Sequence, residues 1–377
     1  APPSRPRPAA RPARPPADSG QLRQVALDFP SRPAYSRDMT IHLRKLWAGL
    51  CLVALPVFAE PAPPPVAPIL PTEFHGWTNA YRLQNDRAEA VLVPALGRLV
   101  HFASLQGTSP FRLEPALQGQ MPAEGEHFFN IGGDWFWPVA QARWAGISAD
   151  GKDWPPPALL ADRPWDCSAW TDAEGTSCAQ FTREYGAPLN ILVSRLFCLA
   201  PGSSALVVRQ RIERTAASDV PVVLWNVSQI AQAEQIVLPV GGKSKFRGGL
   251  NALMGRMPSR KYLVRCGDAA VYRVSPGAET KLGSDSPRGW IAAAKDTNLV
   301  FESVANAATG DYPDGGSVVE VYSNQGLGYS EIETLSPELD LEPGTVLENV
   351  LRIELSSTAA PLDPCPLADA VRALAAP

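Results

Sequence analysis

The chain has 377 residues, of which 45% are hydrophobic and 19% are charged, with 39 prolines and a formal net charge of −4. This length is enough for one large domain or two small domains with a hydrophobic core. Residues 1–59 hold nine basic and three acidic residues, so 25 basic and 35 acidic residues follow them. An acidic body without a basic stripe argues against nucleic acid as a partner.

The first part of the chain has the composition of a leader and an export signal. Residues 1–38 are rich in Pro, Ala and Arg and are too poor in apolar residues to fold, so we expect a disordered leader or untranslated sequence. Met39 then opens a basic segment and an apolar stretch that ends in Val57-Phe58-Ala59, which predicts a signal peptide over 39–59. Cleavage near Ala59 would give a periplasmic or secreted protein without a membrane span.

Residues 60–76 are rich in proline and predict an extended tether after the cleavage site. Export implies an oxidising compartment in which disulfides form. An odd number of cysteines follows residue 59, namely Cys167, Cys178, Cys198, Cys266 and Cys365. At least one of them must therefore stay free or pair between chains. Cys167 and Cys178 flank a polar turn, so we expect a local disulfide between these two.

From residue 78 to residue 355 the chain consists of short alternating runs separated by turn residues. Examples are "NAYRLQN" (79–85), "ALVVRQRIER" (205–214) and "VLENVLRIEL" (346–355). More than a dozen such runs without helical periods predict one large antiparallel all-β domain over 77–360. The tail 361–377 contains "LADAVRALA", which predicts one short C-terminal helix. Residues 145–180 lack alternation and predict a long ordered excursion, of the kind that often covers a site.

The stretch "FFNIGGDWFWPVAQARW" (128–144) is the most unusual in the sequence, with three tryptophans, a Gly-Gly pair and one aspartate. Indole faces suit the C–H face of a sugar ring, and carboxylate and amide groups suit its hydroxyls. The alternative is that these indoles fill the core or that the aspartate caps a turn. We therefore expect this stretch to form either the wall of a sugar-binding pocket or a packed turn.

A second candidate lies in "YSEIETLSPELDLEPG" (329–344), where strand alternation places Glu331 and Glu333 on one face. Two neighbouring glutamates on a central strand raise one pKa toward the range useful for proton transfer. On an edge strand the same residues would form a solvated acidic face.

Metal and nucleotide chemistry lack support in the sequence. After residue 59 the chain has only His75, His101 and His127, with no metal-binding spacing, and His101 lies in the middle of a predicted strand. There is also no phosphate-binding loop, no dinucleotide fingerprint and no nucleophile elbow. We expect no metal, no cofactor and a monomeric protein.

These motifs in this order resemble the galactose mutarotase-like superfamily of β-supersandwich proteins and, more narrowly, the DUF4380 family of exported bacterial proteins. The matching segments are "NAYRLQN" (79–85), "VPALGRLVHF" (93–102), "IGGDWFWPVAQARW" (131–144), "WNVSQI" (225–230) and the 329–344 stretch. The resemblance spans about residues 77–355. It implies an antiparallel β-supersandwich that binds a carbohydrate.

Aldose 1-epimerases of this superfamily use a histidine acid and a glutamate base. The resemblance places Ile131 and Val227 where those enzymes have histidines, and Glu331 or Glu333 where they have the glutamate. Only His127 could substitute for the acid. The resemblance therefore implies a sugar-binding protein without standard epimerase activity.

Three functions remain open from the sequence: an exported carbohydrate-binding protein, a divergent epimerase or glycan-processing enzyme, and an envelope interaction module with a filled pocket. The enzyme would use Glu331 or Glu333 together with His127 or Asp134. The predicted ligand contacts are Arg98, Asn130, Asp134, Trp135, Trp137, Gln141, Ser228 and Gln229.

Overall fold

The computed structural model describes residues 67–123, 126, 128–160, 162–241, 243–277, 279–305 and 309–376. The predicted leader 1–38, the predicted signal peptide 39–59 and His127 lie outside the described residues. Two short strands, β1 (Ala67–Pro68) and β2 (Thr72–Phe74), lie within the segment 60–76 that the sequence predicts as a tether.

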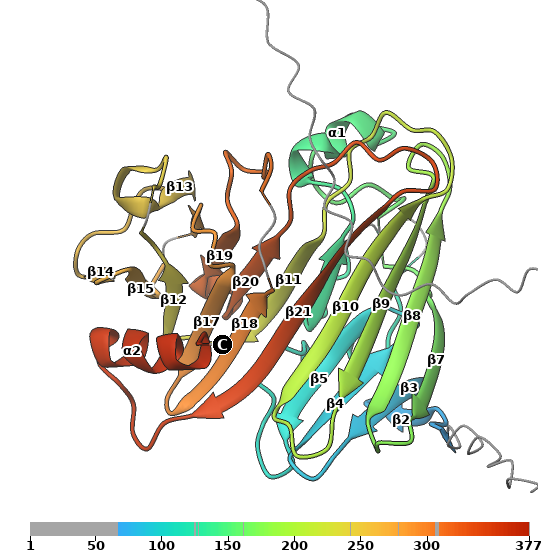
Figure 1. Cartoon of the computed structure of the whole chain (residues 1–377), viewed down its shortest axis with the longest axis horizontal. Helices are drawn as coiled ribbons and strands as arrows, with labels where there is room; N and C mark the ends of the chain where they lie inside the picture. Colours follow the sequence, from blue (N-terminus) through green and yellow to red (C-terminus); the bar gives the residue numbers. More distant parts are fainter. Residues whose placement is uncertain are drawn as a thin grey trace, which may run out of the picture. The chain divides into compact units, whose positions relative to one another are not determined.

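The described chain forms two large sheets, and every strand pairing within them is antiparallel, as Figure 1 shows for the sheet that faces the viewer. The eleven-stranded sheet contains, in spatial order, β1 (Ala67–Pro68), β7 (Asp166–Thr171), β8 (Ser177–Tyr185), β9 (Ile191–Leu199), β10 (Ala205–Arg214), β21 (Val346–Ser357), β18 (Asn298–Val304), β17 (Trp290–Lys295), β12 (Gln235–Pro239), β15 (Ala269–Arg273) and β14 (Leu263–Cys266).

The second sheet has ten strands and carries the site described below. It contains, in spatial order, β13 (Asn251–Met254), β16 (Thr280–Ser284), β19 (Val319–Asn324), β20 (Tyr329–Leu335), β11 (Trp225–Ala231), β6 (Asp134–Trp137), β5 (Arg98–Ser104), β4 (Ala88–Val93), β3 (Trp77–Gln84) and β2 (Thr72–Phe74).

The main core lies between the two sheets because alternate residues of each strand point toward the other sheet. In β9, buried residues alternate with half-buried ones along the whole strand. Val208 and Ile212 of β10 and Ile332 of β20 belong to the same buried cluster, although they come from different sheets. The predicted antiparallel β-sandwich is therefore confirmed.

Helices are few in the described residues. There are two α-helices, α1 (Trp144–Ile147) and α2 (Pro364–Leu374), and four 3-10 turns, η1 (Pro115–Leu117), η2 (Gln141–Arg143), η3 (Arg247–Gly249) and η4 (Gln325–Leu327). The predicted C-terminal helix is α2, while α1 is a single turn that the sequence did not predict. Neither α-helix in this part of the chain is long and apolar enough to cross a membrane.

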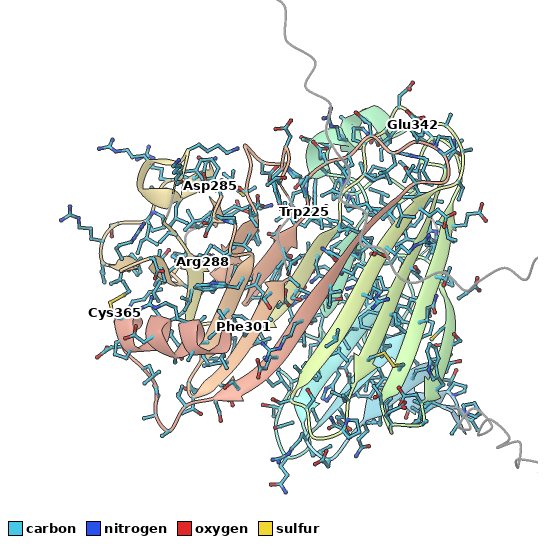
Figure 2. The ribbon with its side chains drawn as sticks, in the orientation of Figure 1. Trp225, Asp285, Arg288, Phe301, Glu342 and Cys365 are labelled. Carbon is cyan, nitrogen blue, oxygen red and sulfur yellow. A yellow bond between two sulfur atoms is a disulfide. The ribbon has the colours of Figure 1, made fainter. Side chains whose placement is uncertain are left out.

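Helix α2 covers the outer face of the eleven-stranded sheet. Its residues Leu367, Ala368 and Val371 are fully buried in a second core cluster with Val271 and Phe301 of the sheet. A disulfide between Cys266 at the end of β14 and Cys365 in the first turn of α2 ties the helix to the sheet edge, and Figure 2 shows Cys365 at this end of the helix.

The predicted local disulfide between Cys167 and Cys178 is wrong. The β7–β8 register pairs Cys167 with Phe181, so the two cysteines lie three positions apart along the hairpin, roughly 10 Å. Cys178 instead lies directly opposite Cys198 on β9, with their Cα atoms 4.2 Å apart, and bonds to it. Cys167 is free and half-buried.

The predicted excursion over residues 145–180 is also shorter than expected. Strand β7 begins at Asp166, and β8 starts at Ser177, so regular structure occupies the second half of this range. The irregular part ends near residue 165, and one of its residues, Trp154, contributes to the cleft described next.

Candidate functional site

A cleft of about 470 Å³ lies on the face of the ten-stranded sheet that points away from the other sheet. Strands β6, β20, β19 and β16 supply its floor, and loops supply its rim. Its lining residues are Phe128, Asn130, Trp135, Trp137, Gln141, Asp153, Trp154, Met254, Glu279, Lys281, Tyr322, Asn324, Leu327, Tyr329, Glu331 and Glu333. This volume falls in the range of small-molecule sites.

The Gly132-Gly133 pair is needed because the chain passes very close to two other segments before β6. Both glycines have positive φ, +106° and +79°. A Cβ on Gly132 would lie 2.1 Å from the carbonyl oxygen of Arg112, and one on Gly133 would lie 2.4 Å from that of Leu99. Larger residues cannot adopt this conformation in this space, so the pair fixes where β6 and its tryptophans begin.

One wall of the cleft is aromatic. Trp135 stacks on Phe128 with ring centroids 5.5 Å apart, and Phe128 meets Trp154 edge-on at 4.8 Å. Trp135 and Trp137 are only 4% and 5% exposed, whereas Trp154 is 45% exposed. The predicted tryptophans therefore form the supporting layer, and Trp154 presents the accessible indole face.

Another part of the lining is polar and is organised by Gln229. Its side-chain amide donates hydrogen bonds to Glu331 Oε1 at 2.9 Å and to Asn130 Oδ1 at 3.0 Å. Its own oxygen accepts a hydrogen bond from Arg112 at 3.0 Å. Gln229 is buried beneath Glu331 and Asn130, so it orients two groups that line the cleft.

Glu333 lies two residues along the same strand face and is held differently. The indole N–H of Trp225 donates to its carboxylate at 2.8 Å, and Lys281 Nζ lies 3.4 Å away. Lys281 also lies 2.8 Å from Glu320 and 3.6 Å from Asp314. The lysine and the three carboxylates form a buried network at the inner end of the cleft.

The two glutamates of β20 that line the cleft have raised pKa values. Burial and the charge of Glu333 raise the pKa of Glu331 to about 7, against a weaker opposing effect of the hydrogen bond from Gln229. Burial also raises the pKa of Glu333, and Lys281 opposes this. For Lys281, burial would lower the pKa, but Glu320, Glu333 and Asp314 raise it above its usual value. The predicted raised glutamate pKa on this strand therefore agrees with these shifts.

Asp134 and Ser228, which the sequence predicts as ligand contacts, lie on the opposite face of the sheet. Asp134 alternates with Trp135 along β6, and it pairs with Arg195 of the other sheet at 2.7 Å. Ser228 lies opposite Asp134 in the ladder and donates to its carboxylate at 3.3 Å. Both are fully buried, so the structure does not bring them together with the cleft residues.

This interior group includes a further acid. Burial and the nearby charge of Asp134 raise the pKa of Glu302 to about 8. Arg195 also donates to Asn226, which accepts a second hydrogen bond from Gln210. These residues form a polar network in the middle of the sandwich, beneath the cleft rather than in it.

Most of the remaining predicted site residues line the cleft, and one lies behind it. Asn130 and Gln141 line the cleft with Trp135 and Trp137. Arg98 is fully buried, pairs with Asp162 at 2.7 Å, and lies 4.0 Å from the ring of Trp135, so it supports the wall from behind.

Sequence reasoning missed several lining residues, most of which lie outside β6 and β20. They are Phe128, Asp153, Trp154, Met254, Glu279, Lys281, Tyr322, Asn324, Leu327 and Tyr329. The sequence does contain a signal for Trp154, because this residue lies in the irregular stretch 145–180 that was expected to cover a site. Lys281 gave none, since a lysine in "ETKLGSD" is indistinguishable from a surface residue until the β16–β19 pairing is known.

The similarity to known proteins concerns the fold. No family model matches the chain, and no curated protein sequence does. A solved TPR-domain containing protein from Parabacteroides distasonis superposes with a TM-score of 0.52 and 14% identity, covering 76% of this chain and 48% of the other. This chain therefore spans about half the length of that protein.

Two further solved structures align along nearly their whole length. The Slr1438 protein from Synechocystis sp. PCC 6803 has a TM-score of 0.50 and 14% identity, covering 78% of this chain and 98% of the other. A galactose mutarotase-like protein from Lactobacillus casei has a TM-score of 0.46 and 13% identity, covering 74% and 100%. At 14% identity, the likeness to the Parabacteroides and Synechocystis proteins shows a shared fold alone, while the resemblance to the DUF4380 family stays a prediction.

Proposed function

We propose that the cleft binds a carbohydrate. The observation that carries this proposal is that an accessible indole, Trp154, and hydrogen-bonding groups such as Asn130 and Glu331 line one cavity. A pyranose presents both kinds of surface, because its C–H face packs on aromatic rings and its hydroxyls exchange hydrogen bonds. The space between these residues is open, which argues against the alternative of an interaction module with a filled pocket.

The first test is binding of the purified chain to a glycan array, followed by calorimetry with the sugars that bind. Trp154→Ala is expected to lower affinity roughly tenfold or more, since a lost aromatic contact removes stacking area and apolar burial. Two equally exposed methionines provide a further test variant and its matched control. Met254 lines the cleft and Met257 does not, and the two side chains are 42% and 43% exposed.

Met254→Ala is therefore expected to weaken sugar binding, while Met257→Ala should leave it unchanged. If no sugar binds, or if Trp154→Ala and Met254→Ala bind as tightly as the unmodified chain, the proposed function is wrong.

A second candidate function is proton transfer to or from the bound sugar by Glu331. The specific observation in its favour is a carboxyl group in the cleft with its pKa raised to about 7, because a base works best near the ambient pH. No described residue that lines the cleft is a histidine, and Val227 and Ile131 are buried apolar residues. The standard acid–base pair of an epimerase is therefore missing from the described lining.

Polarimetry on fresh α-glucose and α-galactose separates the two functions. A binding protein should leave mutarotation at the rate of the buffer. Accelerated decay that is lost in Glu331→Gln would favour the enzyme instead.

We also propose that the protein is exported, with cleavage near Ala59. The two disulfides, Cys178–Cys198 and Cys266–Cys365, support this because such bonds persist in oxidising compartments. N-terminal sequencing of protein isolated from its native cells should begin near Glu60. A chain that retains residues 1–38 would contradict the proposal.

A further inference from the structure

We infer that the sugar bound by the cleft carries a free amino group, so that the cleft selects amino sugars over neutral and acidic ones. This inference rests on the proposed carbohydrate-binding function and adds a substrate class to it. It follows from the charges that face the cleft, from the partners those charges already have, and from the aromatic surface beside them.

The charged groups that line the cleft are mostly acidic. The described lining contains four carboxylates, Asp153, Glu279, Glu331 and Glu333, and a single cation, Lys281. Asp153 and Glu279 are exposed at the rim, while Glu331 is deeper and half-buried. A ligand that enters therefore passes two carboxylates before it reaches a third.

Lys281 is not available to an acidic ligand. Its ammonium group lies within 4 Å of the carboxylates of Glu320, Glu333 and Asp314, and its side chain is only 10% exposed. The ammonium also lies 4.9 Å from the ring of Trp225. These three carboxyl groups already surround the ammonium, so the network offers no free positive charge to a ligand.

The arginines nearest the cleft are also engaged. Arg112 donates to the backbone oxygen of Asn130, pairs with Glu114 at 2.8 Å, and stacks over the ring of Tyr329. Arg98 lies behind Trp135 and pairs with Asp162. Within the described residues, therefore, no cation that lines the cleft is free to neutralise a sugar carboxylate.

The aromatic wall favours a cation as well. The aromatic side chains of Trp154 and Phe128 line the same cavity as Glu331. An ammonium group over such rings is attracted by their negative faces, and a neighbouring carboxylate adds to this attraction. A hexosamine can place its ring on the indole and its ammonium toward the carboxylates. A uronic acid would place a carboxylate against Asp153, Glu279 and Glu331 instead, and like charges repel.

The test is calorimetry of the full purified chain at low ionic strength with matched sugars. The set is glucose, glucosamine, N-acetylglucosamine and glucuronate, together with the galactose series. Glucosamine or galactosamine is expected to bind roughly tenfold more tightly or better than its neutral counterpart, because charge-assisted hydrogen bonds exceed neutral ones. The acidic sugars should not bind measurably. Added salt should reduce the preference for the amine, since rim charges are screened.

Substitutions of single carboxylates show which of them produce the preference for amino sugars. Asp153→Asn and Glu331→Gln keep side-chain size and are each expected to reduce the ratio of amine to neutral affinity several-fold. Glu174→Gln, in the exposed turn between β7 and β8, is the control and should leave the ratio unchanged. Oligomers of glucosamine and of N-acetylglucosamine then show whether the ligand is a free sugar or part of a polymer.

The outcomes separate this inference from the function on which it rests. If neutral or acidic sugars bind as tightly as amino sugars, the inference is wrong and carbohydrate binding stands. If the amine preference persists in full in both variants, the assignment to these carboxylates is overturned. If no sugar binds in any form, both the inference and the proposed function fail.

Discussion

Trp225 donates its indole N–H to the carboxylate of Glu333 at 2.8 Å, across the pairing of β11 with β20. Figure 2 labels Trp225, which is the first residue of β11 in the ten-stranded sheet. The bond connects a fully buried indole to an acid of the cleft. Glu331, two residues away on the same face, has no such indole partner and accepts its hydrogen bond from Gln229 instead. The two glutamates therefore have different surroundings despite identical chemistry.

Trp225→Phe should lower the free energy of unfolding by about 1–3 kcal/mol, since it leaves a buried carboxylate without one of its donors. Urea denaturation at pH 7 measures this change. Trp290→Phe is the control, because it removes the same part of a buried indole from the other sheet. Equal losses in the two variants would mean that ring burial, and not the hydrogen bond, stabilises the protein.

The titration of Glu331 should appear as a pH dependence of stability. Its pKa in the folded protein, about 7, lies above the value of about 4.3 for a free glutamate, so the folded state binds the proton more tightly. Its contribution to stability is therefore complete below about pH 4 and is lost as the pH rises toward 7. The groups that act on this carboxyl are Glu333, Gln229, Lys281, Arg98 and Tyr329.

Urea denaturation of the unmodified chain and of Glu331→Gln at pH 5 and pH 8 measures this dependence. The stability of the unmodified chain relative to the variant should be greater at pH 5 than at pH 8. Taking the difference between the two proteins removes the contribution of Glu302, whose pKa is also raised. A difference that does not change with pH would contradict the raised pKa.

Asp134→Asn should damage the fold rather than alter the choice of sugar. Its carboxylate pairs with Arg195 in the interior, and removing one partner of a buried pair typically costs about 3–5 kcal/mol. The matched substitution Asp153→Asn changes an exposed carboxylate and should change stability by less than about 0.5 kcal/mol. Thermal or urea unfolding distinguishes them. A stable Asp134→Asn variant with changed sugar selectivity would instead indicate that Asp134 contacts the ligand.

Removing the Cys266–Cys365 disulfide should loosen α2 more than the rest of the domain. The bond closes a long loop, with a sequence separation of 99, so loop-closure entropy predicts a loss of about 4–5 kcal/mol when both cysteines become serine. Hydrogen exchange should show faster exchange in α2 and β14 first. Cys167→Ser changes the free cysteine and serves as the control. Uniform protection in the double variant would show that packing alone holds the helix.

The sequence predicts the fold well because strand alternation is a local property. "ALVVRQRIER" alternates in the sequence, and β10 follows it from Ala205 to Arg214. The pairing of strands is not local, and this is why the cysteine pairing was wrong. Cys178 finds its partner on β9, a neighbour that the composition of the hairpin does not reveal.

The same limit explains the mixed result for the site. Alternation correctly groups Glu331 with Glu333 and Trp135 with Trp137, since each pair lies on one strand face. The same alternation places Asp134 on the face opposite to Trp135 and Trp137, and the expectation that grouped all three rested on their closeness in sequence, although Asp134 points into the sandwich. Which residues β16 and β19 bring to the cleft depends on sheet order, and sheet order emerges only from the complete fold.

The alternation of inward and outward residues along β6, β11 and β20 also has a consequence for how such a protein can change. Asp134 and Ser228 stabilise the sandwich, while their chain neighbours Trp135 and Gln229 shape or support the cleft. Replacements at the exposed residues of the cleft can therefore give it a new specificity without disturbing the packing between the sheets, whereas the buried outward residues such as Trp135 also belong to the core. This division makes the cleft suitable for engineering: a library restricted to its exposed lining residues, such as Trp154 and Met254, should keep most members folded while their ligands diverge.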